Sequence, residues 1–95
     1  MELRERIAGL MPQAQQELGE LVALRSVADP RQFPPEECAA AAQWLLGKFS
    51  EVGFSDVHLA ETADGSQAVV GSRSGADSTA PTVLLYSHYD VQPPL

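Results

Sequence analysis

The run TVLLYS (Thr82–Ser87) decides the expected fold, because its apolar residues are consecutive rather than alternate. A short, almost continuous apolar run is typical of a strand that is buried on both faces, as in a parallel sheet covered by helices. The polar, turn-rich stretch SGADSTAP (residues 74–81) precedes it and is expected to form a surface loop. The sequence therefore predicts a buried strand over residues 82–87.

Working back from this run, the sequence predicts a β-hairpin. Between residues 56 and 61 apolar and polar side chains alternate, which is the period of a strand. Asp64-Gly65 lies in the next stretch and is a turn signal, and residues 67–72 are expected to form the returning strand.

Two helices are predicted before the hairpin. Apolar residues recur at steps of three and four from Leu3 to Leu24, and Pro12 marks either a kink or the true start of that helix. A second helix is expected to begin at Pro34-Pro35 and to stop at Gly53, which adopts the left-handed conformation without strain. The predicted fold class is α/β, with two N-terminal helices packed on a mixed three-stranded sheet in a single domain over residues 1–95.

Composition excludes several classes of protein. The chain has 95 residues, 44% of them apolar, which suits one small globular domain. Its 13 acidic and 6 basic residues give a net charge of −7, which argues against a nucleic-acid partner. No apolar run approaches the roughly 20 residues of a membrane-spanning helix. The single cysteine, Cys38, and the absence of a signal-like N-terminus favour the cytoplasm.

The candidate site follows the predicted buried strand. His88 and Asp90 come directly after it, and ligands in open α/β sheets bind beyond the C-terminal ends of strands. In extended backbone, side chains two residues apart project to the same side, so the imidazole and the carboxylate can converge. Such a carboxylate can orient a metal-bound histidine. The alternative is a surface histidine beside a turn, because Pro93 and Pro94 end the element.

The stretch LLYSHYDVQP (residues 84–93) is similar to the signature of the dizinc metallopeptidases that include carnosinases and other dipeptidases, aminoacylases and acetylornithine deacetylase. The resemblance implies an N-terminal part of a dizinc aminopeptidase-like catalytic domain, with the dipeptidase branch favoured. It implies that His88 is a zinc ligand and that Asp90 is the catalytic carboxylate beside it. It further implies two zinc ions and a peptide or N-acyl amino acid substrate.

The remaining ligands and the general base of that family are expected downstream of Leu95. A catalytic zinc needs about three protein ligands, so the chain alone is expected to bind zinc weakly and to be inactive. The alternatives are a non-catalytic truncated product, or a small interaction module in which His88 and Asp90 are incidental.

Other polar or reactive side chains are interpreted structurally. His58 is expected to face solvent on its strand, Cys38 to be a small core residue, and Trp44 to be partly buried packing. Ser26 and Ser87 lack a convincing histidine–acid partner in the sequence, and Ser87 is expected to lie under the site rather than to act as a nucleophile.

Overall fold

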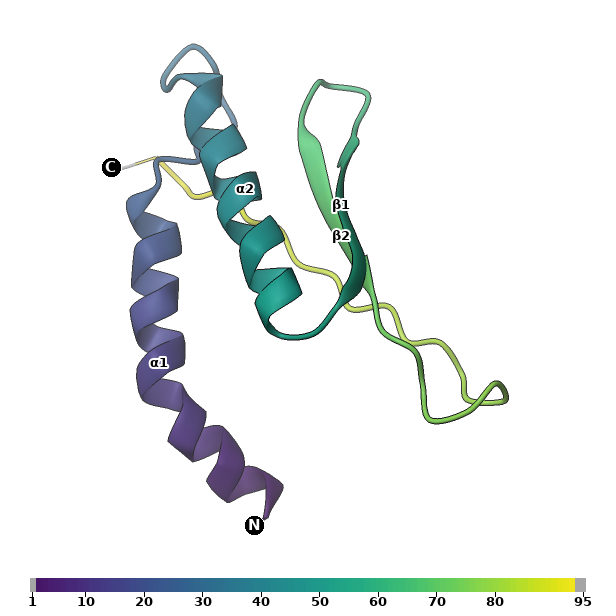
Figure 1. Cartoon of the computed structure of the whole chain (residues 1–95). Coiled ribbons are helices and arrows are strands. Elements are labelled where there is room, and N and C mark those ends of the chain that lie inside the picture. The colour runs from purple at the N-terminus through teal and green to yellow at the C-terminus, as the bar shows by residue number, and fades with distance from the viewer. Residues whose placement is uncertain (1, 94–95) are drawn as a thin grey trace.

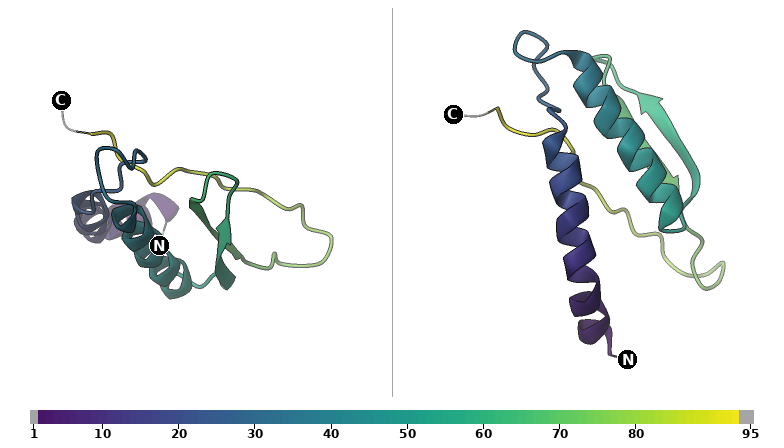
Figure 2. Two further views of the ribbon diagram at one scale, coloured as in Figure 1. Left: turned by 90° about the horizontal axis from the view of Figure 1, so that it is seen from above. Right: turned by 60° about the vertical axis from the view of Figure 1, so that its left-hand side comes forward.

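The structure is a computed structural model that describes residues 2–93. Its elements are, in chain order, α1 (Leu3–Ala23), α2 (Pro35–Glu51), β1 (Ser55–Glu61) and β2 (Gln67–Ser72), as Figure 1 shows. The predicted helices and hairpin are therefore present in the predicted order, and the fold is a small α/β arrangement. After β2 the chain returns past the hairpin and α2 to the junction between the two helices (Figures 1 and 2).

Helix α1 is continuous across Pro12, so the alternative that the helix starts at Pro12 is wrong. A proline inside a helix removes one backbone hydrogen bond and bends the axis, and Figure 1 shows α1 bending in its N-terminal half. None of the residues of α1 is buried, and its apolar stripe, including Leu10 and Leu18, is exposed. The helix is attached to α2 by an ion pair between Glu17 and Lys48, with 3.3 Å between Oε1 and Nζ.

Helix α2 makes the principal packing contact of the fold, because it lies against both strands of the hairpin. It begins as predicted behind Pro34, with Glu36 and Glu37 in its first turn, where acidic groups favour the helix dipole. It buries Ala41 and Ala42. Gly71 of β2 permits the close approach, since a Cβ there would lie 3.1 Å from Cβ of Phe54 and 3.3 Å from Cδ2 of Phe49.

Strands β1 and β2 pair in antiparallel register, with His58 opposite Val70 and Glu61 opposite Gln67. The turn between them is closed by Asp64, whose carboxylate accepts hydrogen bonds from the Thr62 hydroxyl and, at 3.0 Å, from the Ser66 amide. These bonds lower the pKa of Asp64 to about 2. The hairpin predicted from the alternation and the Asp-Gly signal is confirmed.

The predicted third strand is wrong for the residues that the structure describes. Residues 82–87 have no strand assignment, and the sheet contains two antiparallel strands rather than three mixed ones. Their predicted burial is also wrong, since Val83 is 74% and Leu84 is 88% exposed. The physical reason is the lack of a paired backbone, because a strand forms only beside another backbone, and residues 82–87 form no backbone hydrogen bond to the free outer edge of β1 or β2.

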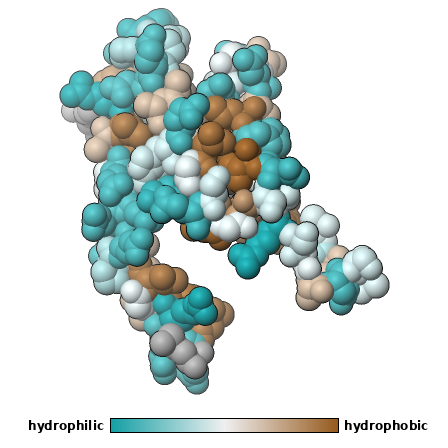
Figure 3. All heavy atoms as spheres, viewed as in Figure 1, coloured by the Kyte–Doolittle hydropathy of each residue, from teal (hydrophilic) through white to brown (hydrophobic). Residues whose placement is uncertain are grey.

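The chain covers little of its own apolar surface. Its Cα radius of gyration is 15.7 Å, whereas a compact domain of 100 residues has a radius of about 13 Å. Among the described residues only Ser26, Val27, Ala41 and Ala42 are buried. Figure 3 shows apolar surface between α2 and the hairpin and again along α1. No helix in residues 2–93 has the length and apolar character needed to cross a membrane.

Candidate functional site

His88 and Asp90 are in direct contact, as the spacing of two residues predicts. Nδ1 of His88 lies 2.8 Å from Oδ1 of Asp90. An ionised carboxylate can only accept, so Nδ1 carries the proton and the lone pair of the neutral ring is on Nε2. The His88 side chain is 72% exposed, which leaves Nε2 open to a ligand. This is the geometry that a metal-binding histidine requires, although its role as a ligand stays a prediction.

The segment that carries the pair is attached to the loop between α1 and α2 through Ser26. The Ser26 hydroxyl donates to the carbonyl oxygen of Tyr89 at 3.1 Å, and the Val91 amide donates to the carbonyl oxygen of Ser26 at 3.1 Å. The two bonds lie on either side of Asp90. Ser26 is itself fully buried at 0% exposure, so these contacts form away from solvent.

Tyr89 attaches the same segment to the hairpin. Its hydroxyl donates to the carbonyl oxygen of Gln67, the first residue of β2, at 2.6 Å. Burial raises the pKa of Tyr89, and the nearby Cys38 and Asp90 raise it further. Neighbouring side chains of an extended chain point to opposite sides, so anchoring Tyr89 at the hairpin directs His88 and Asp90 away from it.

Cys38 of α2 lies beneath the segment. Its thiol donates to the Val27 carbonyl oxygen at 3.5 Å. Burial raises the pKa of Cys38, and the charges of Asp90 and Glu37 raise it further. Cys38 is only partly buried, so the prediction that it is a small core residue is met in part: its thiol is protonated and packs against a carbonyl group.

The predictions for His58 and Ser87 differ in outcome. His58 is exposed on β1 and its Nδ1 lies 2.6 Å from the Asp56 carbonyl oxygen, so the prediction that it faces solvent is confirmed. Ser87 is exposed and its hydroxyl donates to the His88 carbonyl oxygen at 3.3 Å. It therefore does not lie under the site. Pro94, part of the turn predicted after the site, falls outside the described residues.

The donor set fits one ligand position of a zinc site and no more. Within residues 2–93 no three histidine, cysteine or acidic side chains are grouped so that they could hold a metal ion. His88 Nε2 is free and well oriented, while a catalytic zinc requires about three protein ligands. A complete site would need ligands in addition to these.

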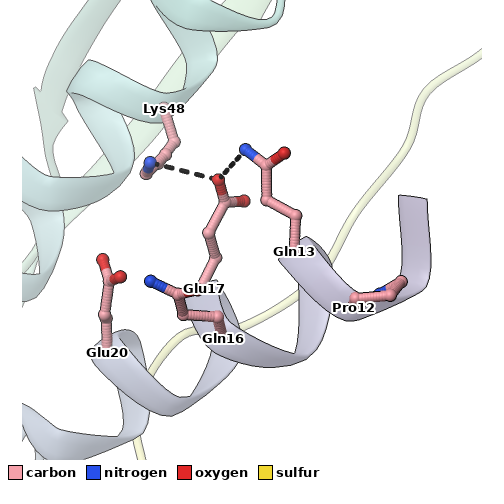
Figure 4. Close-up of a pocket in the computed structure, with 6 residues that line it drawn as sticks. All are labelled: Pro12, Gln13, Gln16, Glu17, Glu20 and Lys48. Carbon is pink, nitrogen blue, oxygen red and sulfur yellow. Dashed lines mark hydrogen bonds and ion pairs between the residues drawn. The ribbon is translucent and has the colours of Figure 1, made fainter. Parts of the chain in front are cut away.

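Two shallow pockets lie near the helices. One, of about 510 Å³, adjoins the candidate site and is lined by Val22, Arg25, Val27, Phe33, Val91 and Gln92. The other lies between α1 and α2 (Figure 4) and is polar. There a hydrogen bond from Gln13 and another from Lys48 lower the pKa of Glu17. This second pocket marks a helix–helix contact rather than a reactive group.

Sequence reasoning did not identify Ser26, Tyr89 or Gln67 as supports of the site. Ser26 and Tyr89 are 63 positions apart in the chain, and Tyr89 and Gln67 are 22 apart. Contacts over such separations follow from tertiary packing and leave no periodic signal. The one available sign was a serine within a loop that precedes a helix, and this pattern is common.

Two curated proteins are similar to the chain. It is 39% identical to the cysteinylglycine-S-conjugate dipeptidase of Corynebacterium striatum over 80 residues. This alignment covers 82% of this chain and 16% of that protein. It is 31% identical to the Cys-Gly metallodipeptidase of Candida albicans over 105 residues. This alignment covers 98% of this chain and 21% of that protein. At that coverage the second alignment includes His88 and Asp90. No family model and no solved structure matches.

These similarities support a metallodipeptidase family for the chain. The chain spans only 16% of the length of one relative and 21% of the other. Both relatives are dipeptidases, so the aminoacylase and deacetylase branches of the resemblance stay predictions.

Proposed function

We propose that the chain is the N-terminal part of a metallodipeptidase catalytic domain and that His88 supplies one zinc ligand through Nε2. The observation that carries the proposal is the 2.8 Å contact from Nδ1 of the exposed His88 to Asp90, which occupies Nδ1 and leaves Nε2 as the ring nitrogen that can bind a metal. The similarity to two dipeptidases over most of the chain supports it.

Each of the two site residues has a definite task in this proposal. Asp90 accepts the Nδ1 proton of His88, which fixes the tautomer and increases the electron density at Nε2. Zinc, when bound, polarises the substrate carbonyl and lowers the pKa of a bound water. Two zinc ions are proposed for the complete site, with the additional ligands and the general base outside residues 2–93.

A dipeptide is the proposed substrate, in preference to an N-acyl amino acid. The names of both relatives describe dipeptidases for Cys-Gly or its S-conjugates. We propose that the 95-residue chain alone has no turnover and binds zinc weakly, because its described residues offer one oriented ligand. A cytoplasmic location is proposed from the single cysteine, which cannot form an internal disulfide.

The test is a chimera in which this chain replaces the matching region of the C. striatum dipeptidase. Its hydrolysis of a cysteinylglycine S-conjugate is measured with and without His88→Ala. We expect kcat/KM to fall by more than about 100-fold, because even supporting residues of a metal site are worth about 10- to 100-fold. His58→Ala is the matched control and should leave kcat/KM unchanged, since His58 lies on the hairpin.

An active chimera that His88→Ala leaves unaffected would contradict the proposal. That result would favour the alternative of an interaction module in which His88 and Asp90 are incidental.

A further inference from the structure

We propose that Ser26 is a positioning residue of the candidate site: its hydroxyl and its carbonyl oxygen together fix the backbone on both sides of Asp90, and thereby the orientation of the His88 ring. This inference rests on the proposed function for its catalytic meaning. Its geometry stands on the described residues alone. The feature that suggests it is a fully buried serine with two hydrogen bonds to one short segment.

The two hydrogen bonds of Ser26 enclose a single residue of the segment. Ser26 Oγ holds the Tyr89 carbonyl oxygen at 3.1 Å, and Ser26 O holds the Val91 amide at 3.1 Å. Only Asp90 lies between these two points. With its neighbours held, the backbone of Asp90 has little freedom, so its carboxylate meets Nδ1 of His88 from one direction.

The position of Ser26 is itself fixed locally. The Ser26 amide donates to the Leu24 carbonyl oxygen and the Val27 amide donates to the Arg25 carbonyl oxygen, each at 2.8 Å. These are two consecutive tight turns that follow the end of α1. The serine is therefore presented by a defined backbone and is able to act as a fixed point.

Ser26 positions Asp90, whereas Tyr89 attaches the segment to the hairpin. The Tyr89 hydroxyl still bonds to the Gln67 carbonyl oxygen when the Ser26 hydroxyl is removed, so the segment stays beside the hairpin. What is lost is the restraint on one side of Asp90. The carbonyl group of the half-buried Tyr89 would then lack its donor, which favours a shift of the segment toward water.

The chemistry of Ser26 excludes a nucleophilic role. Its hydroxyl donates to a backbone carbonyl oxygen rather than to a histidine, and at 0% exposure it is closed to substrate. The two histidines of the chain provide an internal comparison. Both have Nδ1 at an oxygen acceptor, Asp90 for His88 and the Asp56 carbonyl group for His58, but only His88 depends on the segment that Ser26 holds.

The test measures ring ¹⁵N chemical shifts of the 95-residue chain at pH 8, where an ordinary histidine is neutral. In the unsubstituted chain we expect the Nδ1–H tautomer at both histidines. In Ser26→Ala, and in the nearly isosteric Ser26→Cys with its weak donor, we expect His88 to become a mixture of tautomers while His58 stays unchanged. Ser50→Ala is the matched control, because its exposed hydroxyl bonds within α2.

A folded Ser26→Ala chain, as judged by circular dichroism, with an unchanged His88 tautomer would overturn the inference. If that variant unfolds, Ser26→Cys decides by the same criterion. Amide exchange in the unsubstituted chain decides independently of any variant. Val91 should exchange at least ~10-fold more slowly than Leu85 after correction for sequence, and equal rates would overturn the inference.

Failure of this inference is distinguishable from failure of the proposed function. The tautomer and exchange measurements need neither metal nor turnover, whereas the His88→Ala chimera tests the metal ligand directly. A tautomer change at His88 without an effect of His88→Ala on turnover would retain the geometry and remove its catalytic meaning.

Discussion

Two neighbouring stretches of this chain behave in opposite ways. Residues 82–86, the apolar segment, are all exposed, with Leu84 at 88%. Residues 89–91, the held segment, carry polar groups and yet are partly buried and bonded to two distant elements. Hydrophobicity alone would predict that the apolar segment is buried and the held segment exposed. Burial in this chain therefore depends on whether a segment has hydrogen-bonding or packing partners beside it.

The partners explain the difference. Tyr89 and Val91 find donors and acceptors at Ser26 and Gln67, which the loop after α1 and the start of β2 already hold in place. The apolar segment needs a backbone to pair with on its edges and apolar side chains to cover its faces. Within the described residues, β1 and β2 pair with each other, and the apolar segment forms no backbone hydrogen bond to the free edge of either strand.

The largest stability effect of a single substitution is expected from Ser26→Ala. It removes a hydroxyl donor at a fully buried position from the carbonyl group of the half-buried Tyr89, which costs about 1–3 kcal/mol of the free energy of unfolding. Urea denaturation followed by circular dichroism measures the loss. Ser50→Ala, which removes an exposed hydroxyl group, should change the free energy of unfolding by less than about 0.5 kcal/mol. Equal losses in the two variants would contradict the importance of the held segment.

Tyr89→Phe should have the next largest effect. It keeps the ring and removes only the bond to the Gln67 carbonyl oxygen, with an expected loss of about 0.5–1.5 kcal/mol. The pH dependence of the free energy of unfolding tests the same hydroxyl group. Burial raises the pKa of the folded Tyr89, so its contribution is complete below the unfolded value of about 10 and is lost as pH rises through the folded value.

Unfolding free energies measured between pH 8 and pH 11 should therefore fall more steeply for the unsubstituted chain than for Tyr89→Phe. Parallel curves would show that the hydroxyl group of Tyr89 is not held as described.

Leu84→Ser is expected to change the free energy of unfolding by less than about 0.5 kcal/mol, despite the loss of a large apolar side chain. The reason is that Leu84 already faces solvent in the folded chain. A matched substitution, Ala42→Ser, introduces a polar group at a buried position and should cost more. A large loss in Leu84→Ser alone would mean that the apolar segment is covered in solution.

The smallest effect is expected at the hairpin turn next to Gln67. Hydrogen bonds lower the pKa of Asp64 to about 2, so its contribution is present above the unfolded value of about 3.9 and is lost as pH falls through 2. The ¹H shift of the Ser66 amide should follow this titration. Asp64→Asn should abolish that pH response, and a midpoint near 4 would contradict the turn geometry.

Much of this fold could be predicted from local patterns. Three local patterns predicted the helices and the hairpin: the helical spacing before Leu24, the prolines at the start of α2 and the Asp64-Gly65 turn. Each pattern lies within or next to the element that it predicts. The strand predicted at residues 82–87 failed for a different reason. A continuous apolar run indicates that a segment favours burial, whereas the formation of a strand depends on whether another backbone lies beside it.

The candidate site divides in the same way. The convergence of His88 and Asp90 followed from a spacing of two residues and is observed at 2.8 Å. Ser26 and Tyr89 could not be connected to the site from the sequence, because their hydrogen bonds depend on how α1, α2 and the hairpin pack. Local geometry thus predicted the contact between His88 and Asp90, and tertiary packing determines what holds the segment that carries them.

The most direct test of the central claim, that the held segment presents His88 as a zinc ligand, is the zinc content of the dipeptidase chimera. We expect His88→Ala to lower the zinc retained per chain after dialysis, while His58→Ala retains the amount found in the unsubstituted chimera. Equal zinc content in the His88→Ala variant and the unsubstituted chimera would contradict it.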